Sequence, residues 1–141
     1  MRMDAERIRT LLLKLPSVVE TMQWGANLVF WVGDKAIGGK MFAVVDLDGK
    51  GGPLISYAAG PERFAELVEH EGIIPAPYLA RAHWVAVERW DIFRANEWMR
   101  ELEAAHAIVY SKLPKRTQDV LAMSAKERKA IIAQRKKSVK E

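Results

Sequence analysis

The stretch that decides the fold is LVFWVGDKAIGGKMFAVVDLDGKGGPLISYA, residues 28–58. It contains three runs rich in β-branched and aromatic residues, at 28–32, 41–47 and 54–58, and such runs predict β-strands. The segments between them are rich in glycine and aspartate, which is typical of turns. Because neighbouring strands joined by short links pair antiparallel, this stretch predicts an antiparallel meander.

The residues before the meander carry helical patterns. Asp4 can cap a first helix that reaches about Leu15 and ends at Pro16, since its apolar residues recur at helical spacing. Ser17 and Glu20 then have the spacing of a capping box, which predicts another short helical turn.

After the meander, Pro61 is a good first residue for a second helix and Gly72 a good stop. Residues 73–78 contain two prolines and predict extended or looped chain, residues 83–87 alternate like a strand, and residues 95–110 predict a third helix. The order is therefore helix, three strands, helix, one or two strands, helix. This order favours an α+β fold, a two-layer antiparallel sheet with helices packed on it.

The chain after Pro114 differs in composition. We expect a short helix near 118–123 and a final helix opened by the capping box at Ser124 and Glu127. Residues 115–141 contain nine basic and three acidic residues, whereas residues 1–114 contain 13 basic and 15 acidic ones. We therefore predict one domain over 1–114 and a basic helical extension over 115–141.

Composition excludes several classes of protein. The 141 residues include no cysteine, which removes disulfides, thiol nucleophiles and cysteine-ligated metals and fits a reducing compartment. No apolar run approaches the ~20 residues of a membrane span, and no signal-peptide core is present at the N-terminus. We expect a cytoplasmic protein that does not insert in membranes.

Chemistry-bearing patterns are few. His70, His83 and His106 lie on different predicted elements, so no metal-ligand spacing connects them. No serine stands in a GxSxG motif, and Asp46 and Asp48 are better explained as turn-capping residues. We therefore expect no enzyme, no metal and no cofactor. His83 remains open between a structural hydrogen-bonding role and contact with a ligand or phosphate.

The aromatic residues suggest a surface for contact. In the run 28–32, alternation places Trp31 on the face of the sheet opposite to Phe30, together with Val29. An outer aromatic side chain can stack on a nucleic-acid base or pack against a partner, and it can equally lie beneath a helix. Tyr57 is a second candidate for stacking.

Several segments, in this order, resemble the MmcQ/YjbR family of small, presumed DNA-binding proteins. The strand GGKMFA at 38–43, followed after a helix by HWV at 83–85, carries most of the resemblance. The other matching segments are LP at 15–16, the strand at 28–32, PAPYL at 75–79 and VYSKLP at 109–114. The resemblance implies a two-layer fold related to secretion-chaperone-like folds, also described as CyaY-like with a double-wing motif. In this family, hairpin wings are thought to present basic side chains to DNA.

From this resemblance we predict a non-enzymatic DNA-binding protein of low sequence specificity, which contacts phosphates through its hairpin wings and its basic tail. The candidate residues lie at predicted strand ends, before the His-Trp strand and around Pro114; they are Lys35, Lys40, Lys50, Arg81, Lys112, Lys115 and Arg116.

Two other functions stay open. The first is a protein–protein interaction module, possibly a homodimer, which would use an outer apolar or aromatic face of the sheet. The second is an enzyme or small-ligand binder, for which a deep pocket around His83 would be the sign.

Overall fold

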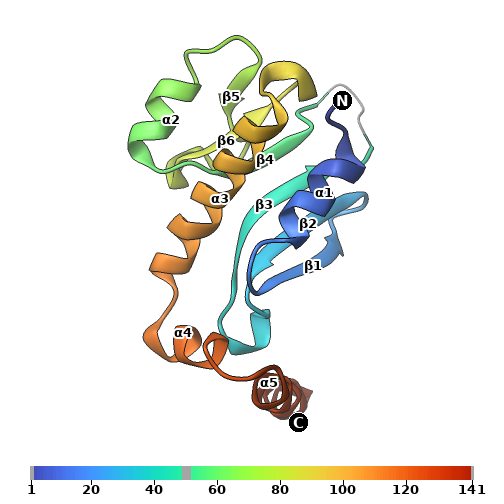
Figure 1. The fold of residues 1–141 in the computed structure, drawn as a ribbon, viewed down its shortest axis with the longest axis vertical. Coiled ribbons are helices and arrows are strands. Elements are labelled where there is room, and N and C mark those ends of the chain that lie inside the picture. Colours follow the sequence, from blue (N-terminus) through green and yellow to red (C-terminus); the bar gives the residue numbers. More distant parts are fainter. Residues whose placement is uncertain (1, 49–51, 141) are drawn as a thin grey trace.

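Among the described residues, six strands form one antiparallel sheet in the order β1-β2-β3-β4-β6-β5 (Figure 1). The bounds are β1 Val18–Gln23, β2 Asn27–Val32, β3 Lys40–Asp46, β4 Ile55–Ala58, β5 Ile73–Pro75 and β6 Trp84–Val87. The computed structural model describes residues 2–48 and 52–140. The antiparallel pairing of β2 with β3 and of β3 with β4 confirms the meander predicted from residues 28–58.

In the part of the chain that the structure describes, five α-helices accompany the sheet: α1 (Ala5–Leu13), α2 (Pro61–Leu67), α3 (Ala95–Lys112), α4 (Lys115–Leu121) and α5 (Ala125–Lys140). Three short 3-10 turns, η1 (Lys35–Ile37), η2 (Ala80–Ala82) and η3 (Trp90–Ile92), lie in the connections. Asp4 caps α1 as predicted, because its carboxylate accepts a hydrogen bond of 2.8 Å from the amide of Arg7. The α2 helix ends at Leu67, before the predicted stop, and the chain turns at Gly72 with φ of 88°.

The prediction of a helical turn at Ser17 and Glu20 is wrong, because this segment leads into and forms β1. Ser17 adopts the left-handed conformation, with φ of 63°, and the β-branched pair Val18 and Val19 favours extended chain after it. The carboxylate of Glu20 caps no helix and instead accepts two hydrogen bonds from Arg9 of α1. The sheet therefore has four strands before α2, where three were predicted.

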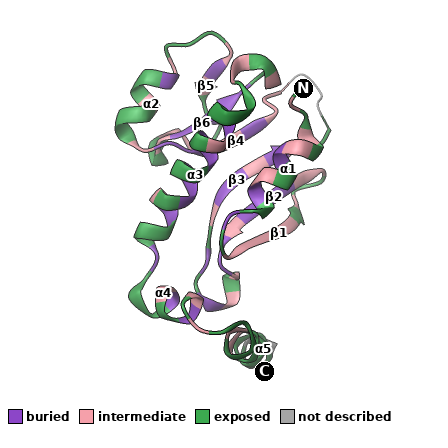
Figure 2. Cartoon of the chain, in the orientation of Figure 1, coloured by how far each residue is buried: buried purple, intermediate pink, exposed green. Residues whose placement is uncertain are grey.

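The main core lies between the sheet and helices α1 and α3. Ile8 and Leu12 of α1, with Trp98 and Leu102 of α3, pack on the inward residues of the strands, among them Phe30. Figure 2 shows the buried sides of the strands and of α3 facing each other. Burial of apolar area at roughly 25 cal/mol per Å² makes this layer the main source of stability.

Alternation along the strands determines which side chains lie on the opposite, outer face of the sheet. The pairing register aligns Val29, Val44, Ser56 and Ala86 across β2, β3, β4 and β6. A bulge between Phe30 and Trp31 on β2 shifts the register. Within the described residues, no helix is long and apolar enough to cross a lipid bilayer.

Helices α4 and α5 lie at one end of the molecule, below the sheet in Figure 1. Thr117 and Val120 of α4 are buried, and α5 lies against η1 and α4. The N-cap predicted at Ser124 for the final helix forms, since the Ser124 hydroxyl accepts from the Glu127 amide at 3.2 Å. The Glu127 carboxylate accepts from the Ser124 hydroxyl rather than from its backbone amide, so only half of the predicted capping box is present. The division into a domain and an extension at 114/115 stays a prediction.

Candidate functional site

Five of the seven predicted basic residues lie on elements that meet at the end of the molecule built by η1, α4 and α5, which we call the basic end. Lys35 is on η1, Lys40 is the first residue of β3, Lys112 ends α3, and Lys115 and Arg116 open α4. All five are exposed. The fold therefore concentrates charges that are scattered along the sequence.

A buried hydrogen bond holds η1 to α4. The hydroxyl of Thr117 donates to the carbonyl of Ile37 over 2.7 Å. At Gly38, with φ of 89°, a Cβ would lie 2.6 Å from the Thr117 hydroxyl oxygen. Glycine therefore allows both the left-handed turn and the close approach of α4.

Helix α5 adds the largest share of the charge. Its Lys136 forms an ion pair of 3.2 Å with Asp34, which caps η1, and its apolar side chains Ile131 and Ile132 are half-buried. In Figure 2, where α5 is seen end-on, most of the helix is coloured as exposed. The basic residues exposed on α5 are Lys126, Lys129, Arg135, Lys136 and Lys137.

Few acidic residues offset this charge. Asp34 binds Lys136, and Asp119 binds Lys115 across one turn of α4. The hydrogen bond that Lys115 donates to Asp119 and the negative charge of that carboxylate raise the pKa of Lys115, so this ammonium stays charged. Glu127 is occupied at the start of α5 by the Ser124 hydroxyl.

Two predicted basic residues are not placed at the basic end. Arg81 is exposed on η2, which contacts β6. Strand β6 lies in the upper half of Figure 1, away from α4 and α5. In the sequence, Arg81 lies just before the His-Trp segment. This position does not reveal that the strand formed there, β6, lies two places from β3 in the sheet. Lys50 lies outside the described residues.

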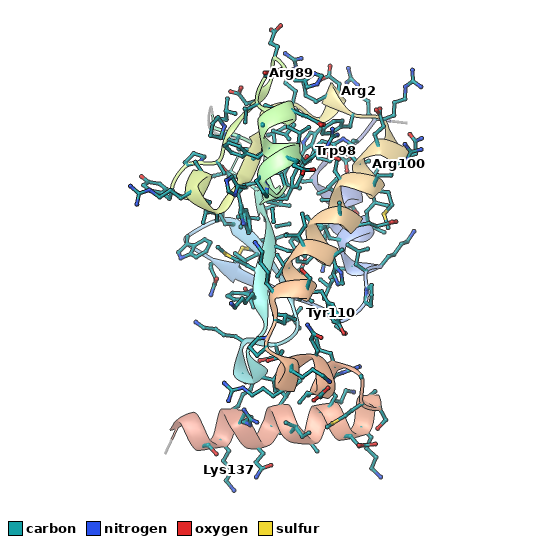
Figure 3. The ribbon with its side chains drawn as sticks, turned by 90° about the vertical axis from the view of Figure 1, so that its left-hand side faces the viewer. Arg2, Arg89, Trp98, Arg100, Tyr110 and Lys137 are labelled. Carbon is teal, nitrogen blue, oxygen red and sulfur yellow. The ribbon has the colours of Figure 1, made fainter. Side chains whose placement is uncertain are left out.

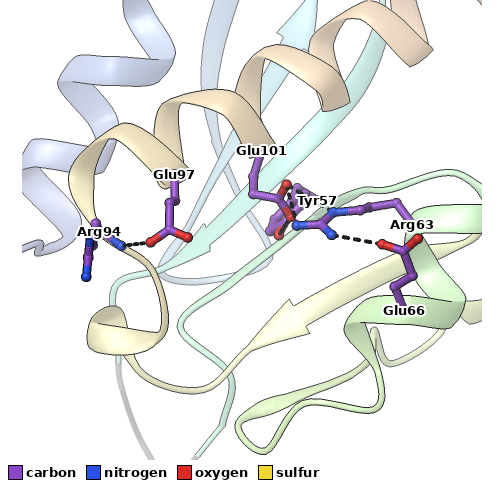
Figure 4. A network of polar contacts seen from close by, with 6 residues as sticks. All are labelled: Tyr57, Arg63, Glu66, Arg94, Glu97 and Glu101. Atoms are coloured by element: carbon purple, nitrogen blue, oxygen red, sulfur yellow. Dashed lines mark hydrogen bonds and ion pairs between the residues drawn. The ribbon is translucent and has the colours of Figure 1, made fainter.

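The prediction that Tyr57 stacks on a base is wrong, because its side chain is buried at 1% exposure. Its hydroxyl donates to Glu101 of α3 at 2.9 Å, and Arg63 of α2 donates to the same carboxylate at 3.1 Å and to Glu66 at 3.0 Å (Figure 4). Burial, and then the neighbouring Glu101 charge, raise the pKa of Tyr57. Tyr57 therefore links the sheet to α3.

Trp31 is half-buried on the outer face, as its alternation with Phe30 predicts. Its indole Nε1 donates to the Thr21 hydroxyl on β1 at 2.8 Å. The ammonium of Lys35 lies 6.0 Å from the centre of its ring, at the limit of a cation–π contact. This pair connects the outer face with the basic end, and a stacking role for Trp31 stays a prediction.

His83 does not begin a strand. It ends η2 with φ of 61°, and its ring packs edge-on against Phe64 at 5.5 Å between centres. Its carbonyl accepts from the Ala59 amide at 3.0 Å, which gives it a structural hydrogen bond through the backbone. Among the described residues there is no cluster of three or more potential metal-binding side chains.

A groove of about 610 Å³ lies on the outer face, and we call it the outer groove. Its size is within the range of about 300–1,000 Å³ seen for ligand pockets. Asn27, Asp46 and Ser56 supply polar groups, and His83 is not among the lining residues. The lining comprises Trp24, Asn27, Met41, Val44, Asp46, Pro53, Leu54, Ile55, Ser56, Pro77, Tyr78 and Leu79.

Sequence reasoning missed the two aromatic residues of this groove. Trp24 is 65% exposed and Tyr78 is fully exposed, although large aromatic residues are usually expected to be buried. A signal was present for Trp24, since Gly25 follows it and the two form the turn between β1 and β2. Tyr78 follows Pro77 in a segment with turn chemistry.

The comparisons with known proteins agree with this architecture. No protein with a curated description matches the chain. A crystal structure of the Deinococcus radiodurans protein DR2400, with the family-model domain DUF419, matches with a TM-score of 0.68 at 27% identity, over 93% of this chain and 88% of that one. A family model described as YjbR matches residues 13–108. Since that match spans more than half of the sequence, the chain belongs to the YjbR family.

Proposed function

We propose that this protein binds DNA, without catalysing a reaction, through the basic end formed by η1, α4 and α5. The observation that carries the proposal is the gathering of Lys35, Lys40 and the α4 lysine and arginine beside a basic helix whose charged side chains are exposed. The expected binding is of low sequence specificity and takes place in the cytoplasm.

The dimensions of the basic end suit a duplex. At 1.5 Å per residue, the 16 residues of α5 give a rod of about 24 Å, whereas a duplex carries one phosphate charge per ~1.7 Å of its axis. Lys129 and Lys137 stand about two helical turns apart, so they can reach different phosphates. Lysines that neutralise phosphates release condensed counterions, and this release supplies affinity without reading the bases.

The hairpin residues extend this surface. Lys35 and Lys40 flank the η1 connection between β2 and β3, and α5 is fixed against that connection by the Lys136–Asp34 ion pair. The connection is the part of the fold that corresponds best to a wing. We therefore expect the wing and α5 to contact one DNA molecule together.

The test is fluorescence anisotropy with a labelled duplex over a series of salt concentrations. We expect log K to fall linearly with log salt, with a slope near −0.9 for each phosphate neutralised. The double variant Lys129→Glu/Lys137→Glu should bind more weakly and should lower the magnitude of the slope by about 2.

The matched control is Arg89→Glu, an exposed residue at the opposite end of the molecule from Lys137 (Figure 3). Its binding and its salt slope should equal those of the wild type. If the wild type binds no duplex at low salt, or if the control weakens binding as much as the α5 variant, the proposal is wrong.

A second candidate is a protein-interaction module that uses the outer face of the sheet, possibly as a homodimer. The exposed Trp24 and Tyr78 beside an apolar groove favour it, because exposed apolar patches often mark contact sites. Sedimentation of the wild type over a range of protein concentrations distinguishes the two, since a dimer with this interface separates in the variant Trp24→Ala.

A further inference from the structure

We propose that the outer groove binds unpaired bases of single-stranded DNA, which stack on Trp24 and Tyr78 while the phosphates of the same strand lie over Lys35 and Lys40. This inference rests on the proposed DNA binding and names the form of DNA that the outer face recognises. Duplex DNA at the basic end and an unpaired segment in the groove are two parts of one substrate.

The first support is the way in which the fold exposes two aromatic rings. Trp24 has φ of 50° and Tyr78 has φ of 66°, and left-handed backbone is sterically unfavourable for a residue other than glycine. Both side chains are nonetheless largely exposed to water, so they gain little stabilisation from burial. Strained residues that gain little from packing tend to occur at functional sites.

The second support is the chemistry between the two rings. Met41, Val44, Leu54 and Leu79 give the groove an apolar surface, which suits the face of a flat aromatic molecule. Base faces stack on aromatic side chains at about 1–3 kcal/mol per base, whatever their sequence. A groove of this kind therefore accepts a nucleobase but does not need to identify it.

The polar groups of the groove match the edges of bases. The amide of Asn27, the hydroxyl of Ser56 and the carboxylate of Asp46 all line it. Asn27 and Asp46 pair directly across β2 and β3, so an acceptor and an amide stand side by side at one end. Amide, hydroxyl and carboxylate groups are those that hydrogen-bond the exposed edges of unstacked bases.

The third support is the charge gradient along the groove. β3 runs from Lys40 to Asp46 beneath it, a distance of about 20 Å at 3.3 Å per residue. The lysine end adjoins Trp31 and Lys35 through the Trp31–Met41 pair, whereas the other end carries the carboxylates of Asp46 and Asp48. Phosphates are attracted to the first end and repelled from the second.

This gradient determines how a strand can lie. Its backbone has to enter at the lysine end, and only uncharged groups, the bases, can proceed toward Asp46. Bases inside a duplex are stacked on one another and cannot reach the aromatic rings without being unpaired. The groove therefore selects single-stranded or locally opened DNA, and its length limits the contact to a few nucleotides.

The test compares three labelled probes with the full-length protein at one salt concentration. These are an oligothymidylate of about 12 nucleotides, an abasic strand with the same number of phosphates, and a duplex of that length. We expect the oligothymidylate to bind more tightly than the abasic strand. Trp24→Ala and Tyr78→Ala should each weaken its binding by about 5- to 150-fold, the range that loss of one stacking contact gives, and should leave the other two probes unchanged.

Two further variants control for folding and for the role of the ring. Tyr78→Phe keeps the aromatic face and should bind the oligothymidylate like the wild type. Tyr110→Ala removes an exposed tyrosine from α3, outside the groove lining, and should change nothing. Thermal unfolding of each variant verifies that the fold is intact.

The outcomes separate the two proposals. If the wild type binds the abasic strand as tightly as the oligothymidylate, or if the two alanine variants bind like the wild type, the groove does not hold bases, while salt-dependent duplex binding leaves the basic end in place. If the two alanine variants instead separate a dimer in sedimentation and leave DNA binding unchanged, the groove is a protein interface. If the wild type binds none of the probes, both proposals fall.

Discussion

The two faces of the sheet are built from the same strands, but the rest of the chain covers them to different extents. Phe30 and Tyr57 point inward and are fully covered by α1 and α3. Their neighbours in sequence, Trp31 and Ser56, lie on the outer face and remain partly exposed. Over β6 the outer-face residue Ala86 is buried, whereas the outer groove begins over β3.

This difference teaches that an aromatic residue in a strand does not by itself indicate the core. Trp98 and Trp24 have the same side chain, yet one is 0% exposed beneath the sheet and the other 65% exposed beside the groove. What separates them is the presence of a covering element and of a partner for the indole N–H. We expect the inner face to carry the stability and the outer face to carry the binding.

The largest effect is expected from Trp98→Ala. The ring of Trp98 packs against Tyr57, Trp90 and Phe93, so its removal should lower the free energy of unfolding by about 3–5 kcal/mol. Trp24→Ala on the outer face should stay within about 0.5 kcal/mol of the wild type. Urea unfolding measures both, and equal losses in the two variants would show that the faces do not differ.

The next effect concerns Tyr57 and depends on pH. Burial, followed by the Glu101 charge, raises the pKa of Tyr57 above its ordinary value of 10.0. Because the folded state keeps this proton longer than the unfolded state, the associated stability is complete below pH 10 and is lost above it, at about 1.4 kcal/mol per pH unit. Tyr57→Phe leaves Glu101 without one donor and should cost about 1–3 kcal/mol at pH 8.

The measurement is urea unfolding of the wild type and of Tyr57→Phe at pH 8 and pH 11. The difference in free energy of unfolding between the two proteins should be smaller at pH 11, since only the wild type has the Tyr57 hydroxyl proton to lose. Tyr110→Phe serves as the control, because Tyr110 is partly exposed on α3. A constant difference between the two pH values would contradict the link between burial and protonation.

Much of the inner face could be predicted from the sequence. The strand runs at 28–32 and 41–47, the cap at Asp4 and the N-cap at Ser124 all depend on neighbouring residues, and all formed. The segment of β1 was predicted wrongly because Ser17 and Glu20 have the spacing of a capping box. The carboxylate of Glu20 instead binds Arg9 on α1. A local pattern gives a wrong prediction where a contact between residues far apart in the sequence determines the structure.

The candidate site was predictable only in part, for the same reason. The basic residues were found from their charge, but their gathering depends on the hydrogen bond from Thr117 to Ile37, 80 residues apart. Tyr57 was misplaced because the cover provided by α3 cannot be seen in the run 54–58. Trp24 and Tyr78 were missed because their exposure follows from backbone turns rather than from the pattern of apolar residues.

A smaller effect is expected on the outer face from Thr21→Val. The variant removes the acceptor of the Trp31 indole N–H, but Trp31 is only half-buried, so water can take the place of the hydroxyl. Valine also suits a strand. We expect a loss of at most about 1 kcal/mol in the free energy of unfolding. A loss larger than that of Tyr57→Phe would mean that the outer polar contacts matter as much as the inner ones.

The smallest effect on stability is expected from Tyr78→Gly. Glycine adopts a φ of 66° without the steric cost that tyrosine bears there, while the fully exposed ring gives up no packing. The gain is offset by the greater chain entropy of glycine in the unfolded state. The free energy of unfolding of Tyr78→Gly should therefore stay within about 1 kcal/mol of that of the wild type. Tyr78→Gly should also be at least as stable as Tyr78→Ala, because alanine keeps the backbone strain at this position.

This variant sharpens the comparison more than the larger ones do. Replacing a residue that stabilises the fold lowers the stability of the protein. Replacing a residue that serves binding weakens binding and leaves the stability of the protein equal or improved. Thermal unfolding and oligothymidylate binding of the same Tyr78→Gly sample separate these cases. If Tyr78→Gly unfolds as readily as Trp98→Ala, the ring is covered in solution and the outer face is a second core; if it keeps its stability and loses the oligonucleotide, the strain at Tyr78 serves to present the ring.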